Sequence, residues 1–412
     1  MRILLLTNDF PLPVDAGGVV RLLGLAETLA ARHEVHLLAR ERSPTPPELI
    51  AALSARLGSP VETFPAPAPI GRGAMAKAAR WTRATMRRTP PWVLTARSEP
   101  LARRAVELAP DFDVAVTLDD NASVYAEEIA GLLPVVLDKQ NVHGASWVDL
   151  RPYGRGVRGR ALHALTLAQL RAWEGRTSAA AAAVVVTSDD EASRFAGVYG
   201  WRPQVVPSAI PTPRLVADPV AAPASVAWLG DHTYFANVDG LLRFVNEAWA
   251  PLGRSGVSLL VAGRRPPAEV RALARVPGVE ILGYVDDLDA LLARSAAAVV
   301  PLWWGVGIKM KTLTLMGAGL PLAATPIALE GVRVHDGMEA LVAESPGDLA
   351  AALERLLADR AAAAEIGRRG REVVLAAHTW DAVGTRFEQA LALAAERGTT
   401  PRHGLRRAAG GS

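Results

Sequence analysis

The segment Pro301–Pro326 gathers residue types that bind phosphate. It reads PLWWGVGIKMKTLTLMGAGLPLAATP, and Gly305 and Gly307 precede Lys309 and Lys311. A strand end, a glycine-rich loop and a following helix would present backbone amides to an anion, and the two lysines add positive charge. Such a loop also occurs as plain scaffold. Because two of the chain's four lysines crowd into this one, we expect a phosphate-binding loop.

A second glycine loop, Asp15–Arg21, follows the first apolar strand. Gly17 and Gly18 at a strand-to-helix turn would let a backbone approach a ligand closely and present helix amides to an anion or a sugar. Arg21 lies in the first helical turn. The alternative is that the two glycines serve packing alone.

Short apolar strands alternate with helical stretches in two successive halves of the chain. The strands are expected at 2–7, 34–39, 114–117, 134–137 and 183–187, and again at 226–230, 258–263, 279–283 and 297–301. This alternation predicts an α/β protein with two Rossmann-like, doubly wound domains facing each other across a cleft. We expect an N-terminal domain (1–206), a proline-rich linker (207–225), a C-terminal domain (226–376), a final helix (377–396) and a disordered tail (397–412).

Composition narrows the class of protein. Half of the 412 residues are apolar and 21% are charged, as in globular proteins. The absence of cysteine excludes disulfides, thiolate metal sites and cysteine nucleophiles. With a net charge of +3 and dispersed basic residues, nucleic-acid binding is not expected. The apolar start MRILLL stops at Thr7 without a small-residue cleavage site, so we expect a buried first strand. A cytoplasmic location, which fits a chain without cysteine, is the expected one.

Residues 71–104 break the alternating pattern. They carry many arginines interleaved with Trp81 and Trp92. A basic stretch with aromatic residues could lie on an anionic membrane, as a peripheral contact at its inner face, or face an anionic lipid-linked acceptor. The alternative is a solvated helical excursion, because the whole chain is rich in arginine, with 41 arginines and four lysines.

The pattern Gly-x-Lys-x-Lys-x-Leu-x-x-Met-x-Ala-Gly-x-Pro, which begins at Gly307, resembles the donor-site region of glycosyltransferase family 4. Other segments resemble the motifs of this family in the same order: Asp15–Arg21, Trp228–Gly230, Asn237–Asp239, Val261–Arg264, Gly283–Leu288 and His378–Asp381. The resemblance covers most of the chain. It implies the GT-B fold, a retaining enzyme that uses a nucleotide-sugar, and a C-terminal helix that crosses back to the N-terminal domain.

The resemblance also implies where the substrates bind. The base of the donor would lie near Tyr284 and Val285. Its diphosphate would lie near a group of basic residues and loop amides: Arg264, Gly307, Ile308, Lys309 and Lys311. The acceptor would bind the N-terminal domain near Gly17, Gly18, Arg21 and the 137–147 segment. No metal is expected, because fixed cations and helix amides stabilise the departing diphosphate, and no cofactor beyond a UDP-, GDP- or TDP-sugar as co-substrate.

The sequence departs from the family pattern in the donor loop. The two usual glutamates are replaced by Val306 and Thr314. At Thr314, a shorter and uncharged side chain stands where a carboxylate normally accepts hydrogen bonds from the ribose. Losing a charge-assisted hydrogen bond could cost about 1.5–3 kcal/mol of donor binding.

The acceptor loop departs as well. Relatives often have His-Asn where this chain has Gln140-Asn141, and His143 lies three residues on. The resemblance implies that His143 contacts the transferred sugar, although a lone loop histidine is more often structural. Asp138 and Lys139 could form an ion pair on the acceptor side, beside Asn141.

We therefore expect a retaining glycosyltransferase that moves a hexose or modified hexose to a lipid-linked, polysaccharide or small-molecule acceptor. Lys311, Arg264 and His143 are the expected catalytic residues. The alternative is a non-catalytic GT-B protein with a binding or regulatory role, which the residues Val306 and Thr314 favour. The oligomeric state is not predicted.

Overall fold

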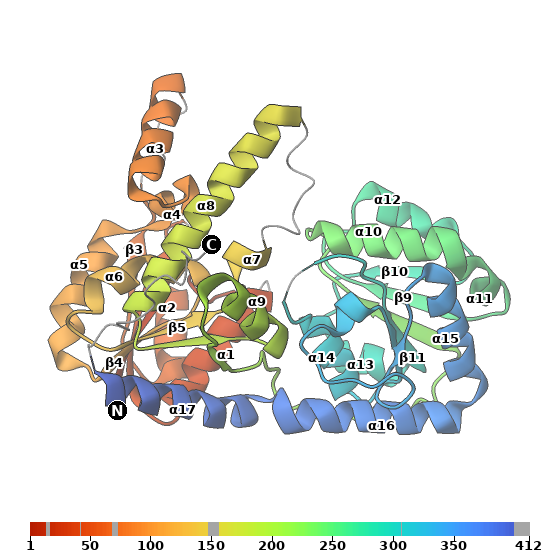
Figure 1. Cartoon of the computed structure of the whole chain (residues 1–412). Helices are drawn as coiled ribbons and strands as arrows, with labels where there is room; N and C mark the ends of the chain where they lie inside the picture. The colour runs from red at the N-terminus through yellow and green to blue at the C-terminus, as the bar shows by residue number, and fades with distance from the viewer. Residues whose placement is uncertain (14–16, 42, 68–72, 147–155, 306, 399–412) are drawn as a thin grey trace, which may run out of the picture. The chain divides into compact units, whose positions relative to one another are not determined.

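The computed structural model describes residues 1–13, 17–41, 43–67, 73–146, 156–305 and 307–398. The chain divides into two compact units, Met1–Val206 with Gly384–Ser412 and Pro207–Val383. We call them the N-terminal and C-terminal units. Each contains one parallel sheet between helices, so the predicted α/β class with two Rossmann-like domains is confirmed (Figure 1). The expected disordered tail lies, beyond Gly398, outside the described residues.

The sheet of the N-terminal unit has the strand order β3-β2-β1-β4-β5-β6-β7. Its strands are β1 (Arg2–Thr7), β2 (Glu34–Glu41), β3 (Val61–Pro65), β4 (Val114–Thr117), β5 (Val135–Lys139), β6 (Ala183–Val186) and β7 (Gln204–Val205). All the pairings are parallel; Leu5 of β1, for example, lies opposite Leu37 and Val116. The central strands are continuous apolar runs because helices cover both faces of a parallel sheet.

The helices of this unit connect successive strands. They are α1 (Gly17–Ala30), α2 (Pro47–Leu57), α3 (Ala74–Arg87), α4 (Pro91–Ala96), α5 (Glu99–Leu108), α6 (Ala126–Ile129), α7 (His143–Ser146), α8 (Gly156–Ala180) and α9 (Asp189–Tyr199). In Figure 1, α3 and the N-terminal part of α8 extend away from the sheet. The last helix, α17 (Trp380–Arg397), belongs to this unit from Gly384 onward, and its Glu388 accepts a hydrogen bond from His33 at 2.9 Å.

The sheet of the C-terminal unit has the order β10-β9-β8-β11-β12-β13. Its strands are β8 (Ser225–Leu229), β9 (Ser258–Ala262), β10 (Val279–Gly283), β11 (Ala297–Val300), β12 (Leu322–Ala324) and β13 (Leu341–Val342). Its helices are α10 (Phe235–Phe244), α11 (Ala250–Arg254), α12 (Ala268–Ala272), α13 (Leu288–Ala293), α14 (Met310–Gly317), α15 (Pro346–Ala358) and α16 (Arg360–Ala377). A π-helical turn, Val245–Trp249, joins α10 to α11.

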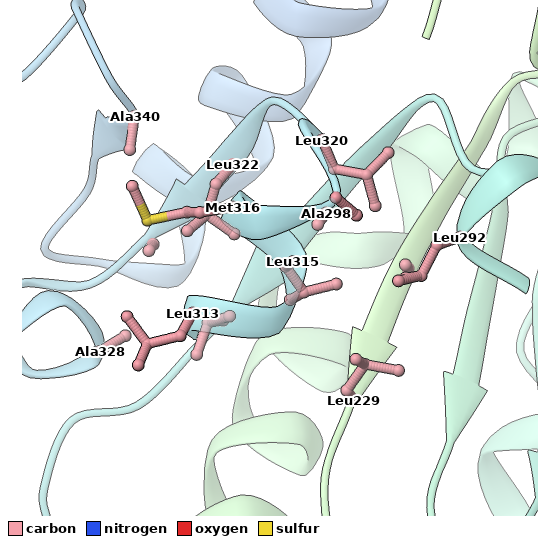
Figure 2. Close-up of a cluster of buried hydrophobic side chains, with 14 of the residues drawn as sticks. Leu229, Leu292, Ala298, Leu313, Leu315, Met316, Leu320, Leu322, Ala328 and Ala340 are labelled. Atoms are coloured by element: carbon pink, nitrogen blue, oxygen red, sulfur yellow. The ribbon is translucent and has the colours of Figure 1, made fainter. Parts of the chain in front are cut away.

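Two apolar clusters fill the two faces of this sheet. Figure 2 shows Leu313, Leu315 and Met316 of α14 within one of them. The short α14 is therefore anchored along one side, which fixes the loop before it. The segment 207–225, expected to be a linker, lies in this unit: the amide of Ile210 donates to the carbonyl of His378 at 2.9 Å.

Two glycines allow close backbone approaches at the carboxyl ends of the central strands. A Cβ on Gly240 of α10 would lie 1.9 Å from the carbonyl oxygen of Pro301, which follows β11. A Cβ on Gly263, which follows β9, would lie 1.8 Å from the carbonyl oxygen of Gly230, which follows β8. Both contacts are with backbone atoms. Glycine at these two positions therefore lets the loops after β8, β9 and β11 pack closely.

We predict that Gly240→Ala lowers the free energy of unfolding by at least about 2 kcal/mol, because overpacking against backbone forces a shift. Gly197→Ala is the matched control, since a Cβ added to this exposed glycine of α9 would have no other atom within 4 Å. Its substitution should raise stability by about 0.5–1 kcal/mol, as expected for a helix interior. Urea denaturation measures both; equal effects would contradict the close approach.

Candidate active site

The predicted phosphate-binding residues lie at one edge of the C-terminal sheet, where β8, β9 and β11 end. The loop after β11 contains Gly305 with φ 135° and Gly307 with φ 74°. Side chains rarely adopt either conformation, so glycine is required at both positions. The loop leads directly into α14, whose first turn carries Lys311. Val306, between the two glycines, lies outside the described residues.

Lys311 is partly buried against the ends of β8 and α10. Its Nζ donates a hydrogen bond to Oδ1 of Asn237 at 2.7 Å and lies 4.9 Å from the centroid of the Trp228 ring. Burial, and secondly the charge of Lys309, lower the pKa of Lys311 to about 7. Near neutral pH this amine is thus poised to take up a proton when an anion arrives.

Lys309 and Arg264 are both held by carboxylates. Nζ of Lys309 donates to the carbonyl of Gly307 at 2.6 Å and lies 3.1 Å from Oε2 of Glu330, and both side chains are nearly buried. Arg264 donates to Oδ2 of Asp231 at 2.6 Å. Glu330 and Asp231 are not predicted site residues, because no spacing in the sequence links them to their basic partners.

The remaining predicted donor residues are spread along the same edge. Tyr284 follows β10 and is 70% exposed, which suits stacking on a flat ring, and Val285 packs against the core cluster drawn in Figure 2. Ile308 also packs against that cluster. The hydroxyl of Thr314 donates to the carbonyl of Met310 at 3.0 Å, within α14. The Thr314 hydroxyl can therefore accept a hydrogen bond from another group but has no proton left to donate.

A cavity of about 460 Å³ lies in the N-terminal unit, lined by residues that follow β1, β4 and β5. Its polar lining includes Asp9, Asp119, Asp120, Gln140 and His143. The strand order of the sheet reverses between β1 and β4, and in parallel α/β proteins ligands bind at such reversals. We call it the carboxylate cavity.

His143 and Asp120 form a pair in this cavity. Nε2 of His143 lies 3.3 Å from Oδ2 of Asp120, and the His143 side chain is 37% exposed. Burial acts to lower the pKa of His143, but the Asp120 carboxylate overrides it and the pKa is raised. The pKa of Asp120 is held below its usual value despite burial, chiefly by His143. Asn141 donates to the same carboxylate at 3.4 Å.

Asp119, beside this pair, was not identified from the sequence. Its carboxylate accepts hydrogen bonds from the hydroxyl of Thr7 and the amide of Asn8, both at 2.7 Å, and from the amide of Ala122 at 2.9 Å. Burial raises the pKa of Asp119 to about 6 against the effect of these bonds. The signal in the sequence that could have identified Asp119 is its place in the loop that follows β4.

The prediction that Arg21, Asp138 and Lys139 contact an acceptor is wrong. All three are buried, with 1%, 0% and 0% of their surfaces exposed. Nε of Arg21 donates to Oδ2 of Asp138 at 2.9 Å, and Nζ of Lys139 donates to Oε1 of Glu174 at 3.0 Å. Asp138 and Lys139 do not pair with each other, because successive residues of a strand point to opposite faces.

Glu174 of α8 holds the loop that carries His143. Besides Lys139, it accepts hydrogen bonds from the amide of Gly144 at 2.9 Å and from the hydroxyl of Tyr199 at 2.6 Å. A fully buried carboxylate with three donors fixes the start of α7. It positions His143 and does not itself line the carboxylate cavity.

The first glycine loop is described from Gly17 onward, so Asp15 lies outside the described residues. Gly17 begins α1, and Gly18 lines the carboxylate cavity. A Cβ on Gly18 would lie 2.8 Å from Oε1 of Gln140, whose amide group donates to the carbonyl of Gly18 at 3.3 Å. Gly18 thus serves packing against Gln140 as well as the cavity wall.

The basic residues of 71–104 divide into two groups. Arg97 is paired with Glu128 at 2.6 Å and Arg104 with Glu62 at 3.0 Å, whereas Arg83 and Arg87 are exposed on α3. A peripheral membrane contact therefore stays a prediction. Of the helices that the structure describes, none combines the length and apolarity that crossing a membrane requires. In the same ranges, no cluster of three acidic or histidine side chains is arranged to hold a metal ion.

We predict that Asp138→Ala lowers the free energy of unfolding by roughly 3–5 kcal/mol, because it leaves the buried guanidinium of Arg21 without its carboxylate. The double variant Arg21→Met/Asp138→Leu should recover much of this loss. Glu128→Ala, which breaks the more exposed pair with Arg97, should cost less than about 1 kcal/mol. Chemical denaturation measures all three, and a neutral Asp138→Ala would restore the acceptor interpretation.

Known proteins resemble this chain in fold and, over one segment, in sequence. The family model of glycosyl transferases group 1 matches residues 223–359, within the C-terminal unit. None of the curated protein sequences matches the chain. Anabaena HepE, solved in complex with UDP and glucose, is similar with a TM-score of 0.65 and 14% identity, over 95% of this chain and 99% of that one.

Two further structures are similar. Sucrose-phosphate synthase from Thermosynechococcus elongatus matches with a TM-score of 0.66 and 17% identity, over 94% of this chain and 97% of its own. The lipopolysaccharide outer core galactosyltransferase WaaB in its apo form matches with a TM-score of 0.60 and 12% identity, over 95% of this chain and 99% of its own. The chain thus has the GT-B fold, and its residues 223–359 match the family model of glycosyl transferases group 1.

Proposed function

We propose that this enzyme transfers a hexose or modified hexose from a nucleoside-diphosphate sugar to an acceptor hydroxyl, with retention of configuration. The observation that carries the proposal is Lys311, held partly buried with a pKa of about 7 beside the glycine loop of α14. A diphosphate leaving group needs positive charge where its negative charge develops. The assignment to family 4 in particular stays a prediction.

The sugar donor is proposed to bind at the carboxyl edge of the C-terminal sheet. The diphosphate would lie at the N-terminus of α14, where amides of the first turn and Lys311 converge. Arg264 and Lys309 already have carboxylate partners and would act mainly by their positive charge. Tyr284 offers an exposed ring to the base. Thr314 supplies a hydroxyl oxygen in place of a carboxylate, so the ribose is held without a charged acceptor.

A UDP-sugar is the first donor to test. The HepE structures were solved with UDP, with UDP and glucose, and with UDP-glucose, and they share the fold of this chain at 14–15% identity. GDP- and TDP-sugars complete the panel. A thermal shift identifies the nucleotide, because a ligand specific to the native state raises apparent stability by mass action.

The acceptor end is proposed to be the carboxylate cavity of the N-terminal unit. Carboxylates such as Asp120 accept hydrogen bonds from sugar or acceptor hydroxyls, and His143 can donate one. A strong protein base is not needed in a retaining front-side reaction, because the departing diphosphate itself takes the acceptor proton. The bond from the anomeric carbon to the diphosphate breaks as the bond to the acceptor oxygen forms on the same face.

We predict that Lys311→Met lowers kcat/KM by about 10²–10³, as expected for the loss of one electrostatic donor. At pH 8 the free enzyme holds Lys311 mostly neutral, and a bound diphosphate raises its pKa. Binding of UDP should therefore take up close to one proton in the wild type and much less in the variant. Calorimetry in two buffers of different ionisation enthalpy measures this uptake.

Arg254→Met is the matched control, because it removes an exposed cation just before the amino end of β9, at the opposite edge of the sheet. It should leave both the proton uptake and kcat/KM unchanged. Equal proton uptake in the wild type and in Lys311→Met would remove Lys311 from the diphosphate site.

A further inference from the structure

A second cavity adjoins the carboxylate cavity in the N-terminal unit. It has a volume of about 320 Å³ and is lined by residues of α3, α4 and α8. Its lining includes Arg80, Trp81, Pro91, Trp92, Leu162 and Thr166. We call it the tryptophan cavity. Trp92 lines both cavities.

The walls of the tryptophan cavity are largely apolar, yet they are open to solvent. Trp92 is 39% exposed and Leu162 is 48% exposed, although both are large apolar side chains. Trp81 is partly buried on the facing helix α3. Aromatic and aliphatic walls of this kind favour a flat or bulky apolar group, which would remove them from water.

One polar group in the wall is left unsatisfied. Nε of Arg80 is buried and has no hydrogen-bond acceptor within the parts of the chain that the structure describes. A guanidinium keeps its charge at every physiological pH, so it cannot relieve this cost by losing a proton. An oxygen of a bound ligand, best an anionic one, would accept a hydrogen bond from the partly buried guanidinium of Arg80.

We infer that the acceptor is an anionic amphiphile whose apolar body occupies the tryptophan cavity. Its negatively charged oxygen meets Arg80, and its hydroxyl reaches past Trp92 to Asp120 and His143. This inference rests on the proposed function and adds the chemical class of the acceptor. A plain sugar would fill the carboxylate cavity and leave the apolar walls exposed. A lipid-linked phosphate and an aromatic carboxylic acid both have the required chemistry.

Binding can be tested without any transfer reaction. Anilinonaphthalene sulfonate has an apolar aromatic body and one anionic group, and its fluorescence rises on binding. Leu162→Trp should fill the cavity and weaken binding of this probe by at least about tenfold. Leu165→Trp is the matched control, because Leu165 is similarly exposed on α8 and does not line the cavity. Both positions are on the surface, so both variants are expected to fold.

The charge is tested in the same way. Arg80→Gln should weaken probe binding about tenfold or more, as expected for losing a charge-assisted hydrogen bond. Arg83→Gln removes an exposed arginine one turn along α3 and should leave binding unchanged. If each variant and its matched control bind the probe equally, the inference is overturned.

Displacement of the probe distinguishes the two candidate acceptors, a lipid-linked phosphate and an aromatic carboxylic acid. Displacement by a polyprenyl phosphate or by a hydroxylated aromatic carboxylic acid supports the inference and identifies which source applies. Displacement by methyl glucoside but by neither amphiphile overturns it. UDP binding, measured by calorimetry, should be the same in Leu162→Trp and the wild type. A failure of UDP binding in every form would instead count against the proposed donor site, and leave the probe result standing.

Discussion

In a parallel sheet that helices cover on both faces, the strand ends are where backbone groups and loops meet solvent. Both sheets of this chain reverse their strand order, between β1 and β4 in one unit and between β8 and β11 in the other. At a reversal, the connections on either side run to opposite faces and leave the strand ends uncovered. Lys311 lies at one reversal and Asp120 at the other, and each unit therefore builds its site from loops that follow neighbouring strands.

Loops that carry polar side chains must be held rigid if they are to bind a ligand in one geometry. This chain does so with buried charges. Glu174 accepts hydrogen bonds from Lys139 of β5, the amide of Gly144 next to His143, and Tyr199 of α9. Asp138 neutralises Arg21 behind the same loop. Burying these charged groups costs desolvation free energy. Hydrogen bonds to each carboxylate from donors on several elements offset that cost. Arg21, Asp138 and Lys139, which the sequence suggested as acceptor contacts, are thus buried supports of the loop that carries His143.

The two lysines of the donor loop show how environment divides the roles of identical side chains. Lys309 lies against Glu330 and its charge is compensated within the fold. Lys311 has an amide oxygen and an indole ring as neighbours, and burial, with the nearby charge of Lys309, lowers its pKa. In the proposed function, the negative charge beside Lys311 comes from the donor's diphosphate. Lys311, unlike Lys309, would therefore gain an ion pair when the diphosphate binds.

The sequence by itself determined the α/β class, the two-unit organisation and the glycine-lysine loop after β11, because apolar runs and the glycine-rich spacing are local patterns. It also singled out His143, which lines the carboxylate cavity, as a candidate sugar contact. It could not show that Arg21 and Asp138 meet across 117 residues, that Glu330 neutralises Lys309, or that Asp119 and Asp120 face the same cavity. Strand order decides these contacts. The strand order depends on how whole strands pack against one another, and the local sequence of each strand does not specify its neighbours.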